Sequence, residues 1–305
     1  MPEVRAHRSG TFCWADLPTT DLDHTIAFYS ELFNWRAIET GSEEQRYVLF
    51  QRQGKTVAGA YPITAEQIES GASPRWSSYL ATKAIDELCT RAQELGATLV
   101  TPASDVPGVA RMAVLRDPEG AAFTLYQAEG SIGAEVLNEP GALCWFELYA
   151  RDLEQSTRFY ADLFGYELRT MAGLGGVPYV QLGIGKGAAG GALQIRPECA
   201  EVPPMWAVYF QTDDLDAAIL RAESHGGNLL MAATEIPGVG RFAMLSDPQG
   251  ASFMVMQMGA AAPSSTPPTS ENESDLEAAD LEEDLEDIAS EVEAGLMGGN
   301  DEPKS

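Results

Sequence analysis

One long stretch of this sequence occurs twice. Residues 13–33, which open with Cys-Trp, return as residues 144–164, and each matched position lies 131 residues further along the chain. A match of this length at one fixed offset indicates an internal repeat, which has to be recognised before a fold is assigned. The Pro-Gly-Val of residues 107–109 returns at 237–239, at an offset of 130. A chain of 305 residues has room for two domains of this kind.

The repeat divides the chain into two similar domains and a tail. We expect the first domain at residues 8–128, a linker at 129–140 and the second domain at 141–258. Residues 259–305 are rich in Ala, Pro, Ser, Thr and carboxylates, which is typical of a disordered tail. Within that tail, apolar residues of 275–296 lie on one helical stripe. That segment is either a solvated acidic region or an amphipathic helix that docks on a protein partner.

Periodicity predicts the elements of the first domain. Residues 11–18 alternate as a strand does, and Thr20 or Asp21 can cap the helix that follows. Leu22, Ile26, Tyr29 and Phe33 fall on one face of that helix, which should pack on a sheet. Residues 64–74 read as a connector. The remaining elements are strands at 47–53, 56–63, 76–82, 111–115 and 122–127, and a helix over residues 85–95.

Two glycine-containing segments are interpreted as turns. Asp117-Pro118-Glu119-Gly120 joins two strands, because Pro fixes one turn position and Gly supplies a positive φ, and residues 247–250 repeat it. The run from Gly183 to Gly191 lacks the order of a phosphate-binding loop and predicts a hairpin. Gly59 and Gly190 lie where a ligand could approach the backbone closely.

Charge and cysteine content exclude several classes of protein. The net charge is −27, and residues 1–260 alone carry 32 acids against 18 bases, so nucleic acid is not an expected partner. No run of 18 apolar residues and no secretory signal are present, so we expect no membrane segment. Cys13, Cys89, Cys144 and Cys199 form no Cys-x-x-Cys pair and are expected as free thiols in a reducing cytoplasm.

The helix start Asp-Leu-(Asp/Glu)-x-x-x-x-Phe-Tyr, the closing Asp-Pro-x-Gly turn and the duplication together resemble the vicinal oxygen chelate superfamily. This superfamily contains glyoxalases, bleomycin-resistance proteins and extradiol dioxygenases, and the resemblance covers residues 8–258. It implies an α+β fold of two tandem domains. Each domain would consist of paired βαβββ modules that form a cup-shaped sheet around a small-molecule ligand, and in the metalloenzymes a divalent ion.

The residues that the resemblance assigns to metal binding are absent. The positions taken by metal ligands in the family's enzymes fall on Trp14, Ser77 and Thr124 in the first domain, and the matching strand at 57–63 has no carboxylate. In the second domain they fall on Trp145, Ala207 and Met254, with no carboxylate in 190–195. Transition metals favour imidazole, and hard cations need several oxygens from one cavity. We therefore expect no cofactor and no metal ion at the usual positions, and a divalent ion held by other residues stays open as the alternative.

Other side chains of the cups can bind a ligand or carry out chemistry. Asp16 and Glu147 follow the two tryptophans by two residues and so share their strand face, which makes them the candidate catalytic or ligand-binding acids. Aromatic and cationic residues complete the expected ligand site, namely Trp14, Trp145, Tyr79, Tyr209, Arg111 and Arg241. The alternative interpretation is purely structural: the rings fill closed cups, and each acid pairs with Arg111 or Arg241.

Three hypotheses about function follow. The first is a glyoxalase-like, metal-independent protein that binds a small molecule in one or both cups. The second is an enzyme, either a lyase, an isomerase or an oxygenase, in which Asp16 or Glu147 is a base or an unusual metal ligand. The third is an interaction protein that acts through its acidic tail. The substrate is beyond reach of the sequence, because a fold does not fix a function.

Overall fold

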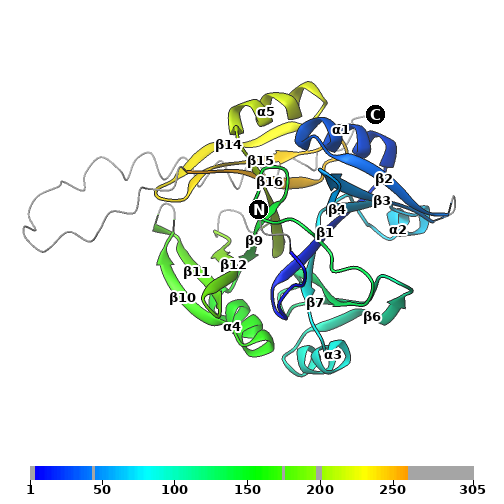
Figure 1. The fold of residues 1–305 in the computed structure, drawn as a ribbon. Helices are drawn as coiled ribbons and strands as arrows, with labels where there is room; N and C mark the ends of the chain where they lie inside the picture. The colour runs from blue at the N-terminus through cyan, green and yellow to red at the C-terminus, as the bar shows by residue number, and fades with distance from the viewer. Residues whose placement is uncertain (1–3, 43–44, 174–175, 197–200, 260–305) are drawn as a thin grey trace, which may run out of the picture.

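The computed structural model describes residues 4–42, 45–173, 176–196 and 201–259 (Figure 1). Its first domain comprises β1 (Phe12–Thr19), α1 (Leu22–Phe33), β2 (Arg36–Ser42), β3 (Gln45–Arg52), β4 (Lys55–Pro62), α2 (Ala65–Glu69), β5 (Ser77–Ala81), α3 (Ile85–Glu94), β6 (Thr98–Val106), β7 (Ala110–Arg116) and β8 (Ala122–Ala128). The second comprises β9 (Leu143–Ala150), α4 (Leu153–Phe164), β10 (Glu167–Ala172), β11 (Pro178–Ile184), β12 (Gly187–Gln194), β13 (Met205–Thr212), α5 (Leu215–Ser224), β14 (Asn228–Ile236), β15 (Gly240–Ser246) and β16 (Ser252–Met258).

Each domain builds one eight-stranded sheet, and the two sheets have the same strand order. The first runs β2-β3-β4-β1-β5-β8-β7-β6, and the second runs β10-β11-β12-β9-β13-β16-β15-β14. The two modules of each domain meet where their opening strands pair antiparallel, β1 with β5 and β9 with β13. This arrangement confirms the expected α+β fold of two tandem domains with paired modules.

Helix α1 illustrates how the local sequence sets an element. The side chain of Asp21 accepts a hydrogen bond from the backbone N–H of His24 and caps the helix, and Asn34 ends it in the left-handed conformation. Tyr29 and Phe33 are buried as the periodicity predicts, and Phe28 is buried as well. The reason is a second contact, because Phe28 packs edge-on against Phe253 of the other domain at a ring distance of 6.3 Å.

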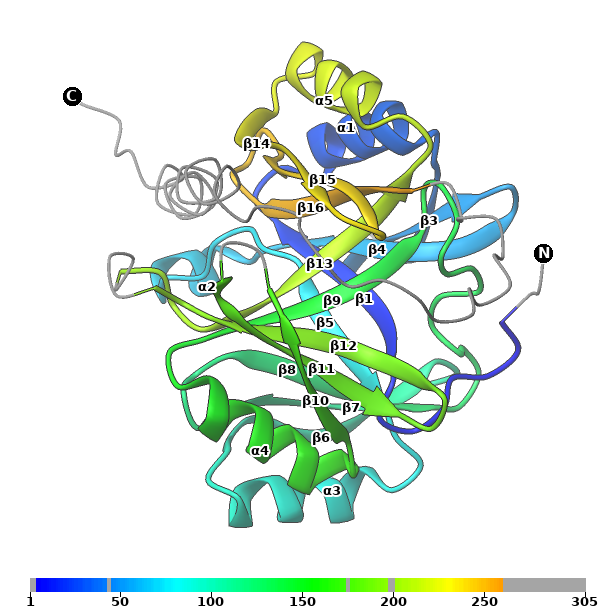
Figure 2. The ribbon, with the colours of Figure 1, turned by 90° about the vertical axis from the view of Figure 1, so that its left-hand side faces the viewer.

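The two domains are held together by reciprocal contacts. Helix α1 lies beside α5, and α3 lies beside α4, in both views of the molecule (Figures 1 and 2). Tyr29 of the first domain donates a hydrogen bond to Asp247 of the second at 3.3 Å, and Tyr160 of the second donates to Asp117 of the first at 3.1 Å. Since all four side chains are buried, the domains share one hydrophobic interior.

The elements missed by sequence periodicity lie on the exposed rims. Most residues of β2 and β6 are exposed, so neither strand has the alternating pattern that predicts one, although the family resemblance implied additional strands. The segment expected as a plain connector, 64–74, contains the short helix α2. Its start is a capping box in which Thr64 and Gln67 bond each other's backbone N–H groups.

The structure also bears on the cysteines, the glycine-rich run and the absence of membrane segments. Cys13, Cys89 and Cys144 are free thiols, as predicted, whereas Cys199 falls outside the described residues. The expected tail and its segment 275–296 also fall outside them. The run from Gly183 to Gly191 forms the β11–β12 hairpin, as predicted. In the part of the chain that the structure describes, no helix is long and apolar enough to cross a membrane.

Candidate ligand-binding site

Strand register brings the predicted aromatic and acidic residues of the first domain onto one face. Trp14 pairs with Tyr79 across β1 and β5, Asp16 lies between Gly59 and Ser77, and Tyr79 pairs with Thr124 of β8. Paired residues of neighbouring strands point to the same side of a sheet. We call this face the first cup, and the matching face that carries Trp145, Glu147 and Tyr209 the second cup.

Asp16 is the centre of a hydrogen-bonded group in the first cup. Its Oδ2 accepts a 2.7 Å hydrogen bond from the hydroxyl of Tyr79 and a 3.3 Å hydrogen bond from that of Tyr47. The indole Nε1 of Trp14 donates to the Tyr47 hydroxyl at 3.2 Å. Two tyrosines therefore fix one oxygen of a carboxylate that is only 3 % exposed.

The other oxygen of Asp16 is not satisfied. Oδ1 is buried and has no hydrogen-bond partner among the described residues. Burial raises the pKa of Asp16 to about 6, although Tyr79, Tyr47 and Ser77 favour the ionised form and oppose the rise. A buried acceptor without a partner is costly, so a ligand donor that reached this oxygen would be favoured.

Gly59 makes room for this arrangement. A Cβ atom at position 59 would collide with the hydroxyl of Tyr47, and one at Gly191 would collide with that of Tyr179 in the second cup. The expectation that glycine here admits a ligand to the backbone is therefore wrong for Gly59, whose space the tyrosine occupies. At Gly190 the close neighbours are the Phe146 carbonyl and the ring of Phe12, which likewise belong to the protein.

The second cup repeats the pattern with a longer acid. The hydroxyl of Tyr209 donates to Oε2 of Glu147 at 2.5 Å, and Trp145 donates to Tyr179 at 3.1 Å. Burial raises the pKa of Glu147, and hydrogen bonds from Tyr209, Tyr179 and Tyr149 oppose the rise. Unlike Asp16, Glu147 has no buried oxygen without a partner in the described structure.

The walls of the two cups differ. In the first cup Thr101 is exposed and Val114 half-buried, whereas the corresponding residues of the second cup, Met231 and Met244, are each 1 % exposed. A satellite hydrophobic cluster fills the second cup with residues that include Ala207, Tyr209, Met231, Phe242, Met244, Met254 and Met256. Its methionines pack closely over the sheet. In the first cup the exposure is confined to the outer strands, because Trp14, Asp16, Tyr79 and Thr124 are buried.

The arginines predicted for the ligand site lie elsewhere. Arg111 forms ion pairs with Asp86 of α3 at 2.8 Å and with Asp105 at 3.0 Å. Arg241 pairs with Asp216 of α5 at 2.9 Å. Both arginines lie on the face of the sheet that the helices cover. Successive residues of a strand point to opposite faces, and each arginine is adjacent in sequence to a residue that faces the cup. The alternative that these arginines neutralise Asp16 and Glu147 is therefore also wrong.

Sequence reasoning missed two members of the site. Tyr47 and Tyr179 complete the hydrogen bonds around the acids, and both belong to a repeated Tyr-Val pair at an offset of 132. That repetition was a usable signal, because the third strand of each module contributes to the same face as the first. Tyr79 and Tyr209 do contact Asp16 and Glu147, as their strand spacing suggested.

The positions that correspond to the family's metal ligands do not suit a metal ion. Ser77 and Thr124 offer hydroxyls and Trp14 offers an indole, and at the second cup Ala207 and Met254 offer no hard donor. Across the described residues, no cluster of three or more His, Cys, Asp or Glu side chains could hold a metal ion. Asp16 alone cannot provide the several ligands that divalent cations need.

The aspartates of the repeated Asp-Pro-x-Gly turns do what the turn requires. Oδ1 of Asp117 accepts hydrogen bonds from the backbone N–H of Glu119 and Ala121, and Asp247 does the same in the second domain. Their second oxygens accept from Tyr160 and Tyr29 across the domain boundary, a role the local sequence does not reveal.

Comparison with known proteins agrees with this architecture. The profile of the Glyoxalase/Bleomycin resistance protein/Dioxygenase superfamily matches residues 11–125 and again residues 142–255. The chain is 36% identical over 261 residues to the Mycobacterium tuberculosis protein named "Putative glyoxylase CFP32", covering 84% of this chain and 98% of that one. It is 32% identical over 263 residues to the anthracycline biosynthesis protein DnrV of Streptomyces peucetius, covering 82% and 94%.

Solved structures share the fold at low sequence identity. The Mn(II)-bound glyoxalase from Novosphingobium aromaticivorans superposes with a TM-score of 0.59 at 16% identity, over 82% of each chain. The 2,3-dioxygenase LapB from Pseudomonas sp. KL28 gives 0.57 at 15% identity, over 85% of this chain and 96% of its own. The chain therefore belongs to the glyoxalase/bleomycin resistance protein/dioxygenase superfamily.

Proposed function

We propose that this protein binds a small organic molecule in its first cup, without a metal ion, through Asp16. The observation that carries the proposal is the buried Oδ1 of Asp16, which has no hydrogen-bond partner among the described residues. A ligand hydroxyl or amine that donates to this oxygen would remove the cost of leaving it unsatisfied, which is about 1–3 kcal/mol. Tyr79 and Tyr47 hold the carboxylate in place before the ligand arrives.

The aromatic surroundings suit a compact organic ligand. Trp14 and Tyr79 share the face that carries Asp16, and Tyr61 stacks on Tyr47 with ring centroids 6.0 Å apart. Aromatic side chains provide large contact area and accept flat or partly apolar molecules. Binding sites of this kind combine apolar walls with a few polar groups that fix orientation, and Asp16 is such a group.

The second cup serves the fold under this proposal. Tyr209, Tyr179 and Tyr149 surround Glu147, and the methionine-rich cluster occupies the space in front of it. Duplication preserved the strand pattern, while the outer strands diverged, with Thr101 and Val114 in the first cup and the buried Met231 and Met244 in the second. Closed apolar packing stabilises the domain and leaves no polar group that needs a ligand.

Variants of the two acids test this division. Small organic molecules would be screened for binding by ligand-observed NMR, and dissociation constants of the hits compared among the natural protein, Asp16→Asn and Glu147→Gln. We expect Asp16→Asn to weaken binding at least tenfold and Glu147→Gln to leave it within twofold. Equal effects of the two variants, or loss only in Glu147→Gln, would contradict the assignment to the first cup.

Proton transfer is a second candidate function. A carboxylate with a pKa of about 6 is half ionised at about pH 6 and mostly ionised at neutral pH, which suits a general base, and Asp16 has an oxygen free to take a proton. Asp16 would remove a proton from a carbon next to a carbonyl group, as an isomerase or lyase requires. Exchange of a bound ligand's C–H protons in deuterated water, seen by NMR in the natural protein and lost in Asp16→Asn, would support this function; no exchange for any bound ligand argues against it.

A further inference from the structure

Two arginines near the first cup have no acidic partner. Neither Arg75 nor Arg116 forms an ion pair within the described residues, whereas Arg46, Arg111 and Arg241 each do. Arg36 and Arg221 also form no ion pair in the described structure, but only Arg75 and Arg116 of these arginines line a common pocket. Two guanidinium groups beside one pocket that remain without a carboxylate partner are therefore available for a ligand.

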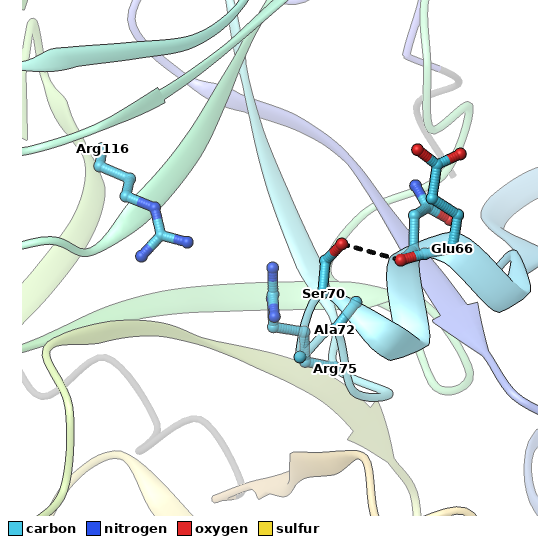
Figure 3. Close-up of a pocket in the computed structure, with 7 residues that line it drawn as sticks. Glu66, Ser70, Ala72, Arg75 and Arg116 are labelled. Atoms are coloured by element: carbon cyan, nitrogen blue, oxygen red, sulfur yellow. Dashed lines mark hydrogen bonds between the residues drawn. The ribbon is translucent and has the colours of Figure 1, made fainter.

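Both arginines line the same cavity. It is a surface pocket, largely open to solvent, of about 290 Å³ between helix α2, the loop after it and the end of β7. Arg75 and Arg116 extend toward it from two sides, while the Glu66 carboxylate points away from them (Figure 3). Ser70, which also lines the cavity, donates its hydroxyl hydrogen to the Glu66 carbonyl at 2.8 Å and so fixes the loop there.

Strand register places Arg116 on the face that carries Asp16. Arg116 pairs with Ala122 at the start of β8. Ala122 precedes Thr124 by two residues, and Thr124 pairs with Tyr79 in the first cup, so all of them point to the same side. Arg116 thus lies three strands from Asp16, or about 14 Å along the sheet at a strand spacing of about 4.8 Å. The long arginine side chain and the curvature of the cup shorten that gap.

Arg75 is linked electrostatically to the same cup. It lies in the segment before β5, two residues before Ser77, which pairs with Asp16. Burial raises the pKa of Tyr61, the negative charge of Asp16 adds to the rise, and the positive charge of Arg75 opposes it. Arg75 and Asp16 therefore have opposite effects on the pKa of the same tyrosine.

The second domain lacks the arginine pair. At the offset of 130, Met205 corresponds to Arg75 and Ser246 corresponds to Arg116. Ser246 is buried, unlike the exposed Arg116. The cup whose acid has an unsatisfied oxygen is therefore also the cup with two unpaired guanidinium groups beside it. In the described structure, the second cup has neither the unsatisfied acid oxygen nor the arginine pair.

We infer that Arg75 and Arg116 form an oxyanion subsite of the first cup, so that its ligand is a small organic acid. The carboxylate or phosphate group of the ligand binds the two guanidinium groups, and a hydroxyl or amine at its other end donates to Asp16 Oδ1. Arginine suits this role because its planar donors match the oxygens of carboxylate and phosphate in pairs. This inference rests on the proposed function, since it names the class of ligand for the same cup.

The overall negative charge opposes the binding of an acidic ligand, and such a subsite offsets this repulsion locally. The chain carries a net charge of −27, which repels anions over the distance of a Debye length, about 10 Å at 0.1 M salt. A local pair of cations offsets that repulsion at one place. The charge pattern also selects orientation, because the acid group of the ligand avoids Asp16 and its donor end meets it.

Titration of the full-length protein with simple anions tests the subsite. Inorganic phosphate and acetate would be added at constant ionic strength while the backbone amide resonances of Ser70, Gly71 and Ala72, which line the same pocket in every variant, are followed by NMR. The variants are the double substitution Arg75→Gln with Arg116→Gln, the exposed control Arg36→Gln, and Asp16→Asn. We expect saturable shifts with at least one of the anions, a more than tenfold weaker response in the double variant, and responses within twofold of the natural protein in the other two.

The outcomes separate this inference from the proposed function. Retention of the anion response in Asp16→Asn supports the subsite whether or not Asp16 binds a ligand donor, and the stronger of the two anions identifies the acid group. Absence of saturable shifts with both anions overturns the inference. So does an equal response in the double variant, and so does a loss in Arg36→Gln as large as that in the double variant.

Discussion

The hydroxyl of Tyr79 donates a 2.7 Å hydrogen bond to Oδ2 of Asp16, while Oδ1 of the same carboxylate, also buried, has no partner among the described residues. The equivalent pair in the second domain, Tyr209 and Glu147, leaves no such oxygen. A half-satisfied buried acid lowers the stability of the folded protein unless something else uses it. The two duplicated domains therefore differ in how fully their buried acids are hydrogen-bonded.

Asp16→Asn should stabilise the protein at high pH and have little effect at low pH. The pKa of Asp16 rises to about 6 in the folded state, so ionisation there destabilises the fold increasingly from about pH 4 to above pH 6. The asparagine oxygen can accept from both tyrosines, and its amide replaces the unpartnered oxygen. Chemical denaturation should give a gain of about 1–3 kcal/mol at pH 8 that disappears at pH 4. A loss of stability at pH 8 would show that the negative charge supports the fold.

Gly59→Ala should disturb the site more than it disturbs the fold. The added methyl group meets the Tyr47 hydroxyl, whose displacement breaks the hydrogen bonds to Asp16 and from Trp14. We expect a loss of about 1–3 kcal/mol in the free energy of unfolding and a changed Trp fluorescence. Gly187→Ala is the control, because a Cβ there meets nothing within 4 Å. Equal stability of both variants would mean that Tyr47 moves at no cost.

Tyr29→Phe should weaken the contact between the domains. The hydroxyl of Tyr29 donates to Asp247 and accepts from Trp76 Nε1 at 3.0 Å, so its removal leaves two buried polar groups without this partner. The expected loss is about 1–3 kcal/mol in the free energy of unfolding, and it should grow above pH 6, because Tyr29 favours the ionised form of Asp247, whose pKa is about 6. Tyr61→Phe serves as the control for loss of a tyrosine hydroxyl. A similar loss in both variants would contradict a specific role for the Tyr29 hydroxyl.

Removal of metal ions should change nothing. The described residues offer no cluster of three or more metal-binding side chains, and Ser77, Thr124 and Met254 stand at positions that the sequence resemblance assigns to metal ligands. After dialysis against a chelator, the melting temperature and the affinity for any ligand found by NMR should match those of the untreated protein. A stoichiometric ion per cup, detected by elemental analysis and lost together with binding, would contradict metal-independent binding.

The sequence predicted the fold well, because duplication supplies two independent copies of each signal. Leu22 and Tyr29 mark one buried helical face, and the Asp117 turn marks a hairpin, so these elements follow from local chemistry. Strands such as β2 and β6 lacked a signal because exposed residues carry no alternation. The bond from Tyr29 to Asp247 joins residues 218 positions apart, and no local pattern reports it.

The candidate site was predictable only in part. Asp16 and Tyr79 were predicted from their spacing along single strands, because residues two apart on a strand point to the same face of the sheet. Arg111 was misplaced because its phase along β7 could be set only by the register with β8. Arg75 and Arg116 gave no signal, since their common cavity depends on the loop after α2 meeting the end of β7.

A crystallographic fragment screen tests the central claim most directly. Crystals would be soaked with small organic acids that also carry a hydroxyl or amine group, together with neutral analogues of the same size. The account predicts density in the first cup, with a donor atom at about 3 Å from Asp16 Oδ1 and the acid group beside Arg75 and Arg116. Fragments bound only in the second cup, or a metal ion held by Asp16, would contradict it.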